Sequence, residues 1–545
     1  MARKNILFIM CDQLRYDYLG CAGHPTIRTP NIDALAAEGV SFANAYCQSP
    51  ICGPSRMSVY TGRYVSSHGS SSNFAPLRIG EKNIGHHLNP LGVRTVLVGK
   101  THMKADTEGM HRLGIDAESE IGVHHSQAGF EVFERDDGVH PDSMVSPDLA
   151  YNDYLKSKGY AEDNNPWHWA ANAVDTGDEV RSGFFNDRVR LPARVGDEDS
   201  ETPYMTRRAM EFLSEDDGET PWLLHLSYIK PHWPYVAPHP YNDMYSPGDV
   251  IPPVRSEAEL TDPNPLVRHF MDRVAGKTFG REQARNTVIP VYMGLITQID
   301  DQLGILFEFM RRRNLLDDTM IVFTSDHGDY LGDHWMGDKD YFHDPSVKVP
   351  LIILDPCTAA DATRGSVDDS LVELIDLMPT FIEHFGGDIP GHILDGRSLL
   401  PNIRGGKTRG REYVISEYDY SCQVFRPETG KMPLDCRSYM VATRKWKFVH
   451  APGYPPVLFD LVNDPGELVD LGRDPDYAGT CQAMLNLLAD WSMQYRQRGT
   501  WSEEHNVRMT GMEEQLGVLI GYWDEADAEG KDPAILPKRD PLNPG

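Results

Sequence analysis

Short apolar runs alternate with amphipathic segments along most of the chain. Five runs have the length of buried strands: residues 5–11 (NILFIMC), 95–98 (TVLV), 222–229 (WLLHLSYI), 320–324 (MIVFT) and 351–354 (LIIL). A nearly continuous apolar run is typical of a parallel strand that is covered on both faces. We therefore predict a mainly parallel sheet that is buried on both sides.

The segments between these runs have the apolar spacing of helices. Thr29 and Pro30 suit a helix cap and first position, and Gly39 suits the end of that helix. A longer helix is predicted over 292–310, where apolar residues recur three and four positions apart. Pro379 is expected to start another helix. Together these patterns predict an α/β fold with a large, mainly parallel sheet sandwiched by helices.

A polar region interrupts this alternation, and a different pattern follows it near the C-terminus. Residues 105–205 are acidic with few periodic segments, and we expect inserted loops there. Short runs at 439–443, 445–450 and 457–461 predict a smaller antiparallel sheet, and residues 483–495 predict a helix after it.

These patterns predict the domain organisation. We expect a main domain at 1–425 with the insertion described above, a C-terminal α+β subdomain at 426–500 and an extended tail at 501–545. The tail is rich in Pro, Asp and Gly, a composition that favours irregular structure.

Composition narrows the classes of function. Of the 545 residues, 40% are hydrophobic, which is enough for a sizeable core and excludes disorder of the whole chain. The net charge of −29 disfavours nucleic acid and anionic membrane surfaces as partners. No apolar run is close to the length of about 20 residues that a helix needs to span a bilayer. The eight cysteines lack paired spacing and we see no export signal, so we expect a cytoplasmic protein without disulfides.

Polar residues that can carry chemistry follow four of the predicted strands. Ligands of open α/β sheets bind beyond the carboxyl ends of the strands, so these residues are expected to meet at one edge. They are Asp12 and Gln13, Lys100 and His102, His232, and Asp326 and His327. The oxygen-rich set of Asp12, Gln13, Asp326 and His327 suits a hard divalent cation. The alternative is that Asp326 caps the segment after it and His327 is a packed core histidine.

The segment at 52–56 (CGPSR) places a cysteine at the predicted start of a helix. Pro54 suits the first turn and Gly62 suits the end. Cys52 would then lie at the positive end of the helix, where an anion is stabilised. Arg56, one turn further on, can donate two parallel hydrogen bonds to a tetrahedral oxyanion. A buried structural thiol with a surface arginine is the alternative that local chemistry leaves open.

These motifs resemble those of a known family. Residues 52–56 (CGPSR) and 61–63 (TGR) resemble the C-x-P-S-R and T-G-R signature of the type I sulfatases (arylsulfatases) in the alkaline phosphatase superfamily. Further matches follow in the expected order: 99–102 (GKTH), 230–232 (KPH), 325–328 (SDHG), Lys339, 458–461 (LFDL) and 464–467 (DPGE). The resemblance covers essentially the whole chain and implies an alkaline phosphatase-like fold.

The resemblance implies a modified nucleophile and a metal. Cys52 would be oxidised to formylglycine by a formylglycine-generating enzyme, and one hydroxyl of the hydrated aldehyde, held on the cation, would attack the substrate. One divalent cation is implied, with calcium expected and manganese or magnesium as alternatives. Its implied ligands are Asp12, Gln13, Asp326, His327 and an oxygen of modified Cys52.

The resemblance also implies roles for the remaining site residues. Arg56 and Lys100 would orient the diol and the metal site. Lys339 and His232 would bind the sulfate, and one of them would protonate the departing alcohol. His102 would act as base on the second hydroxyl, which expels sulfate and regenerates the aldehyde.

Two positions depart from the usual sulfatase pattern. Many sulfatases carry Asp in place of Gln13 and Asn in place of His327, whereas the pattern here resembles that of phosphonate monoester hydrolases and phosphodiesterases. Lys100 and His102 resemble the sulfatases instead. We therefore expect hydrolysis of aryl or other small organic sulfate monoesters, with a phosphonate monoester or phosphate diester hydrolase as the alternative.

A third hypothesis belongs to another class: an unmodified relative that only binds sulfated or phosphorylated ligands. Lys100, His102 and Lys339 argue against it, because binding alone needs no base. The aromatic residues after His232 either flank the leaving group or pack within their own loop. Beyond the sulfate ester and the modifying enzyme, the resemblance implies a homo-oligomer, a dimer or tetramer, in which the tail contacts a neighbouring subunit.

Overall fold

The computed structural model describes residues 4–138, 149–160, 166–216, 218–406, 410–494, 501–516, 520, 523–524 and 526. By density of contacts the chain divides into a main unit, residues 1–389 with 395–495, and a second unit, residues 390–394 with 496–545. Both large sheets lie in the main unit. The described residues of the second unit include two short helices, α17 (Glu503–Arg508) and α18 (Met512–Gln515).

An eight-stranded sheet forms the centre of the main unit, in the order β10-β2-β9-β8-β1-β7-β3-β4. Its strands are β1 (Asn5–Asp12), β2 (Val40–Tyr46), β3 (Arg94–Gly99), β4 (Glu131–Arg135), β7 (Trp222–Pro231), β8 (Thr319–Ser325), β9 (Leu351–Leu354) and β10 (Ser366–Glu373). All neighbours are parallel except β9, which runs antiparallel to both β2 and β8. The fold is therefore the predicted mainly parallel sheet.

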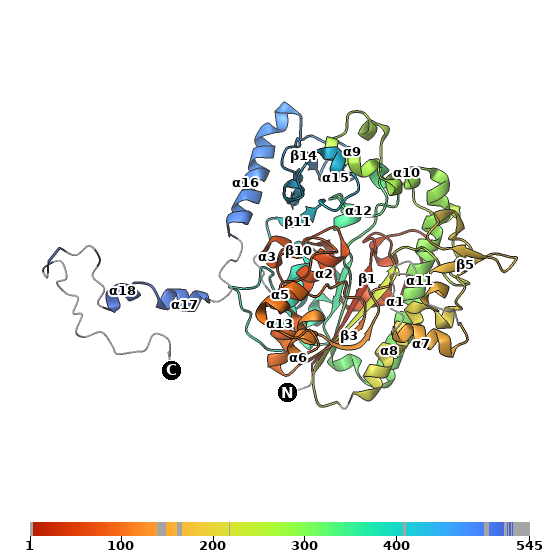
Figure 1. The fold of residues 1–545 in the computed structure, drawn as a ribbon, viewed down its shortest axis with the longest axis horizontal. Helices are drawn as coiled ribbons and strands as arrows, with labels where there is room; N and C mark the ends of the chain where they lie inside the picture. The colour runs from red at the N-terminus through yellow and green to blue at the C-terminus, as the bar shows by residue number, and fades with distance from the viewer. Residues whose placement is uncertain are drawn as a thin grey trace. The chain divides into compact units, whose positions relative to one another are not determined.

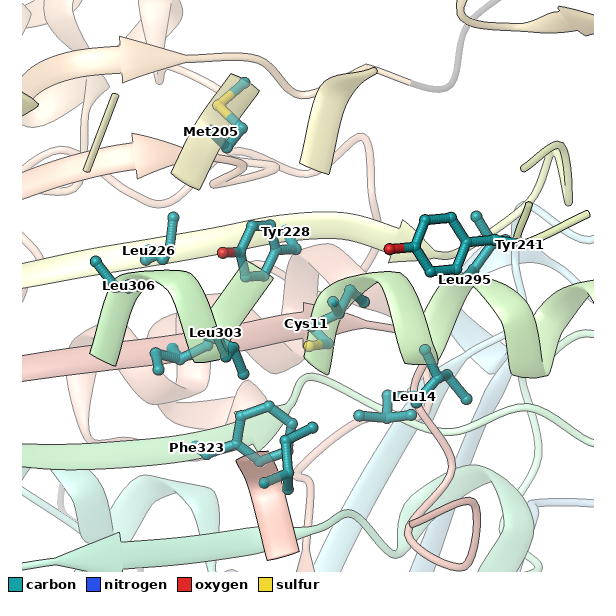
Figure 2. Packing of buried hydrophobic residues seen from close by; sticks show 14 of the residues in the cluster. Cys11, Leu14, Met205, Leu226, Tyr228, Tyr241, Leu295, Leu303, Leu306 and Phe323 are labelled. Atoms are coloured by element: carbon teal, nitrogen blue, oxygen red, sulfur yellow. The ribbon is translucent and has the colours of Figure 1, made fainter. Parts of the chain in front are cut away.

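Helices cover both faces of this sheet (Figure 1). The apolar core on one face joins β1 to α1 (Pro30–Glu38), α8 (Glu201–Glu215) and α11 (Glu282–Arg312). Figure 2 shows this packing, in which α11 presents Leu295, Leu303 and Leu306 toward Cys11 of β1, Leu226 and Tyr228 of β7 and Phe323 of β8.

The opposite face of the sheet packs against α13 (Leu377–His384). There Phe8 of β1 contacts Phe381 at 5.4 Å between ring centroids. Residues alternate between the two faces along a strand, so a strand buried on both sides is apolar throughout. That requirement explains the continuous run at 5–11.

A second sheet of four antiparallel strands follows, in the order β11-β12-β13-β14. The strands are β11 (Val414–Asp419), β12 (Arg437–Ala442), β13 (Trp446–His450) and β14 (Val457–Asp460), and α16 (Ala478–Gln494) packs on them. This confirms the smaller C-terminal sheet. Because β11 belongs to it, the sheet begins before residue 426, where the sequence suggested a boundary.

The described residues of the 105–205 region contain more regular structure than we expected. They include α5 (Thr107–Leu113), α6 (Glu120–Ser126), α7 (Ala150–Ser157) and β4, which is an edge strand of the large sheet. An edge strand is half exposed, and β4 has an alternating, partly polar sequence that hides it from a search for apolar runs. The expectation that this region is only loops was wrong.

The helix predictions were accurate to within a few residues, except for the starts of α11 and of α16, which begins at Ala478 rather than at 483. The first helix begins at Pro30, and α13 begins at Leu377, two residues before Pro379. The long helix α11 begins ten residues before Tyr292, because its first turns are amphipathic only in part. Within the described part of the chain, no helix is both long and apolar enough to cross a membrane.

Candidate active site

The candidate site lies at the carboxyl ends of the central strands. Asp12 ends β1, and Asp326 directly follows β8, the parallel neighbour of β1. Both carboxylates are fully buried. Parallel neighbours end at the same edge of a sheet, so the two groups face one space, as the sequence predicted.

Cys52 is the first residue of α2 (Cys52–Thr61), and its thiol points into this space. Its Sγ lies 3.1 Å from His327 Nε2, 3.4 Å from Lys339 Nζ and 3.6 Å from Asp12 Oδ1. Gly62 ends the helix with a φ of 66°. The geometry favours a residue at the reacting centre over a thiol packed in apolar core.

Two cations join the buried carboxylates. Arg56 donates from Nε to Asp326 Oδ2 at 2.8 Å and pairs through Nη2 with Asp12 Oδ2 at 3.3 Å. Lys100, which follows β3, lies 2.6 Å from the same Asp12 oxygen. Arg56 is fully buried, so the surface arginine that the sequence left open is excluded.

The donor set fits a divalent metal ion. One ligand atom each from Asp12, Cys52, Asp326 and His327 lies within 4.8 Å of all the others, and all four residues are buried. Gln13 adds an amide oxygen, which accepts a hydrogen bond from Lys339 Nζ at 2.8 Å. Oxygen donors with one imidazole suit a hard cation rather than one that prefers thiolates.

The buried charges shift one another. Burial alone would raise the pKa of Asp12, but Lys100 and Arg56 hold that pKa well below its ordinary value. Burial lowers the pKa of His327, yet Asp326 and Cys52 outweigh it and raise that pKa to about 9. The negative field of the carboxylates therefore attracts a positive charge to this position.

Lys339 and His232 form a second pair beside Cys52. Lys339 Nζ lies 2.7 Å from His232 Nε2, and His232 Nδ1 lies 2.6 Å from the Trp233 carbonyl oxygen. Burial and the charge of Lys339 lower the pKa of His232, so its ring is neutral. Nδ1 then carries the hydrogen, and Nε2 accepts from the ammonium of Lys339.

His102 lies close to the cluster but contacts it less directly. Its backbone N–H donates to Asp137 Oδ1 at 2.9 Å, and its φ is 55°. Burial and Lys100 lower the pKa of its ring. Among the contacts of the described residues, none joins the His102 side chain to Cys52.

Three residues that the sequence analysis did not predict shape the site: Asn73, Asp329 and Asp338. Gln13 Nε2 donates to Asp329 Oδ2 at 2.5 Å and to Asp338 Oδ1 at 3.2 Å, which turns the amide oxygen of Gln13 toward Lys339. Asn73 Oδ1 accepts from the Gly53 N–H at 2.8 Å, at the start of α2. Asp329 directly follows the SDHG motif and Asp338 directly precedes Lys339, so the sequence offered a signal for both, whereas Asn73 lies in a loop without any pattern.

Comparison with known proteins agrees with this geometry. The family model described as Sulfatase matches residues 4–387, and the model described as N-sulphoglucosamine sulphohydrolase, C-terminal, matches residues 332–494. Fold and site together define a type I sulfatase of the alkaline phosphatase superfamily. The chain belongs to the sulfatase family. Its relatives include an arylsulfatase, which is a sulfuric ester hydrolase.

Individual relatives cover nearly the full length. The chain is 31% identical to the multifunctional alkaline phosphatase superfamily protein PehA of Trinickia caryophylli, over 91% of this chain and 97% of that one. It is 29% identical to the arylsulfatase of Clostridium perfringens, over 87% and 91%. Among solved structures, the phosphonate monoester hydrolase of Silicibacter pomeroyi superposes with a TM-score of 0.78 at 30% identity, over 91% of this chain and 97% of that one.

Proposed function

We propose that this enzyme hydrolyses sulfate monoesters of aryl or other small organic alcohols to the alcohol and sulfate. The observation that carries the proposal is the position of Cys52, at a helix start and within 3.6 Å of His327, Lys339 and Asp12. Conversion of this side chain to formylglycine supplies an oxygen nucleophile, once the aldehyde is hydrated, in place of the thiol.

Asp12, Gln13, Asp326 and His327 would hold one divalent cation, together with the modified side chain at position 52. We propose calcium, with manganese or magnesium as alternatives, because most of these donors are oxygens. When bound, such a cation neutralises sulfate oxygens and lowers the pKa of the attacking hydroxyl.

The protein's own residues orient the groups and move protons. Arg56 fixes Asp12 and Asp326 relative to the start of α2, and Lys100 holds the same Asp12 oxygen, Oδ2, that Arg56 pairs with. Lys339 and His232 would bind the sulfate. Because Lys339 donates to the neutral His232 ring, this pair holds a proton that either residue can deliver to the departing alcohol oxygen.

His102 would act as the base that releases sulfate. Its ring Nδ1 is buried and has no hydrogen-bond partner among the described residues, and burial keeps the ring neutral and able to accept a proton. A role in the release step fits its place at the edge of the cluster.

A phosphonate monoester or phosphate diester is the second candidate substrate. The observation that favours it is the similarity to the phosphonate monoester hydrolase of Silicibacter pomeroyi. Both substrate classes present a tetrahedral anionic centre, which the same cations can bind, so some cross-reactivity is expected.

Matched substrates test the proposal. We expect an aryl sulfate to be hydrolysed with a kcat/KM that equals or exceeds those of the corresponding phosphonate monoester and phosphate diester. Mass spectrometry of the peptide that contains Cys52 is expected to show the aldehyde. Cys52→Ala should abolish hydrolysis of all three substrates. A sulfate kcat/KM far below both phosphorus esters would favour the second candidate, and unchanged hydrolysis by Cys52→Ala would refute both.

The remaining expectations concern partners and location. We propose maturation by a formylglycine-generating enzyme, a cytoplasmic location without nucleic-acid or membrane partners, and a dimer or tetramer that the tail at 501–545 helps to form. Gel filtration of a chain that lacks the tail tests the last point, and an unchanged elution volume would count against it.

A further inference from the structure

Lys339 lies in a turn whose backbone is unfavourable on both sides. Asp338 and Asp340 have φ values of 64° and 92°, in the left-handed region that favours glycine. Such a conformation persists only where surrounding contacts hold it. The side chains of both residues are also acidic, which opposes binding of an anion at Lys339.

Arg273, the residue before α10 (Val274–Phe279), contacts every residue of this turn. Its Nη1 donates to Asp340 Oδ2 at 2.5 Å and to the Lys339 carbonyl oxygen at 3.4 Å. Its Nη2 donates to Asp338 Oδ2 at 3.3 Å. One planar guanidinium therefore holds the turn and compensates the negative charge on both sides of Lys339.

The same arginine reaches Gln13 through Asp338. The second oxygen of Asp338, Oδ1, accepts from Gln13 Nε2 at 3.2 Å, while Gln13 Oε1 accepts from Lys339 Nζ at 2.8 Å. A continuous chain of charged and polar contacts thus runs from Arg273 to two groups of the candidate site.

We propose that Arg273 is a positioning residue for anion binding, which acts by holding the Asp338–Asp340 turn so that Lys339 points at the reacting centre. The inference deepens the proposed function and rests on its assignment of Lys339 to the sulfate. Arg273 itself contacts neither Cys52 nor any proposed metal ligand among the described contacts.

Inhibition by inorganic sulfate measures this role directly. Arg273→Gln is expected to raise both the inhibition constant of sulfate and the KM of an aryl sulfate by about 10- to 100-fold, the range for loss of a charge-assisted hydrogen-bond network. Arg273→Lys keeps the charge but cannot reach both carboxylates, so a smaller rise of about 3- to 10-fold is expected. Arg268→Gln is the matched control, because Arg268 forms a half-exposed pair with Asp272, and it should change nothing.

A double-mutant cycle separates positioning from general destabilisation. In a Lys339→Ala background, Arg273→Gln should change the inhibition constant less than about threefold, because its route of action has been removed. Full additivity of the two substitutions would overturn the proposal, and so would an unchanged inhibition constant in Arg273→Gln. If Arg273→Gln does not fold, Arg273→Lys carries the same cycle.

A crystal structure of the variant keeps this test distinct from that of the proposed function. If the wild-type enzyme hydrolyses neither sulfate nor phosphorus esters, the proposed function fails. The structure of Arg273→Gln still reports on the turn: we expect Lys339 Nζ to leave Gln13 Oε1. An unchanged turn and contact would overturn the positioning role.

Discussion

The amide of Gln13 has only one orientation that its neighbours allow. Asp329 and Asp338 are hydrogen-bond acceptors, so the NH₂ group must face them and the oxygen must face Lys339. Burial and Asp338 raise the pKa of Asp329 to about 6, so a negative charge at this position is already disfavoured. A neutral amide therefore suits position 13 better than a carboxylate.

We predict that Gln13→Glu destabilises the metal-free protein by about 2–4 kcal/mol, because a third acceptor replaces a donor among buried carboxylates. Chemical denaturation at pH 7.5 measures the change in the free energy of unfolding. Gln127→Glu is the control: the Gln127 oxygen accepts from Arg135 Nη1 at 2.7 Å, so a carboxylate there keeps its partner. Equal effects of the two substitutions would contradict the prediction.

At the scale of an element, the end of β3 decides where Lys100 lies. Gly99 is the last residue of β3 and has a φ of 111°. A Cβ at this position would lie 2.0 Å from the Ser227 carbonyl oxygen of the neighbouring strand β7. Only glycine combines this backbone with such a close approach, and the next residue turns directly toward Asp12.

We predict that Gly99→Ala costs at least about 3 kcal/mol of stability and lowers activity, because backbone strain and a clash with β7 add together. Gly92→Ala separates the two effects. Gly92 also has a positive φ, 78°, but a Cβ there would meet nothing within 4 Å. We expect it to cost only about 1 kcal/mol, from strain alone. Thermal unfolding of both variants provides the comparison, and similar losses would show that the clash is relieved.

At the scale of the whole molecule, polar contacts join the smaller sheet to segments that lie near the site. The ammonium of Lys447, in β13, lies 2.6 Å from a carboxylate oxygen of Asp344 and 2.6 Å from one of Glu467. Asp344 lies in the segment that follows Lys339, and Glu467 lies in the segment that follows β14. Glu417 of β11 accepts from the Ser66 N–H at 2.9 Å, in a segment that follows α2. The smaller sheet thus supports segments adjacent to the site.

Glu417 makes one of these contacts dependent on pH. Burial raises its pKa from 4.5 to about 7, although Ser66 and Arg437 stabilise the charged form; Asp395 adds to the rise. The folded state therefore binds this proton more tightly than the unfolded state, so the carboxyl costs stability as pH rises from about 4.5 to about 7.

We predict that Glu417→Gln removes this cost. The stability of the variant relative to wild type should increase by up to about 3 kcal/mol between pH 4.5 and pH 8. Denaturant unfolding across that range measures the difference. The exposed Glu412→Gln serves as control and should follow the wild-type profile. A constant difference between Glu417→Gln and wild type would contradict the prediction.

The sequence by itself determined the buried strands, most helices and the set of residues from Asp12 to His327 that meet at the sheet edge. It could do so because double-sided burial leaves a local apolar signature, and because parallel strands bring their carboxyl ends to one edge. It also determined that Cys52 begins a helix that ends at Gly62, because helix starts and ends depend on residues that are neighbours along the chain.

Only the tertiary structure decided the order of the strands, the place of β4 at the edge, and the contacts of Asn73, Asp329 and Arg273 with the site. These contacts join residues that lie up to several hundred positions apart, as Gln13 and Asp329 do. An edge strand or a polar loop residue leaves no periodic pattern in the sequence, because its surroundings are set by packing rather than by its neighbours along the chain.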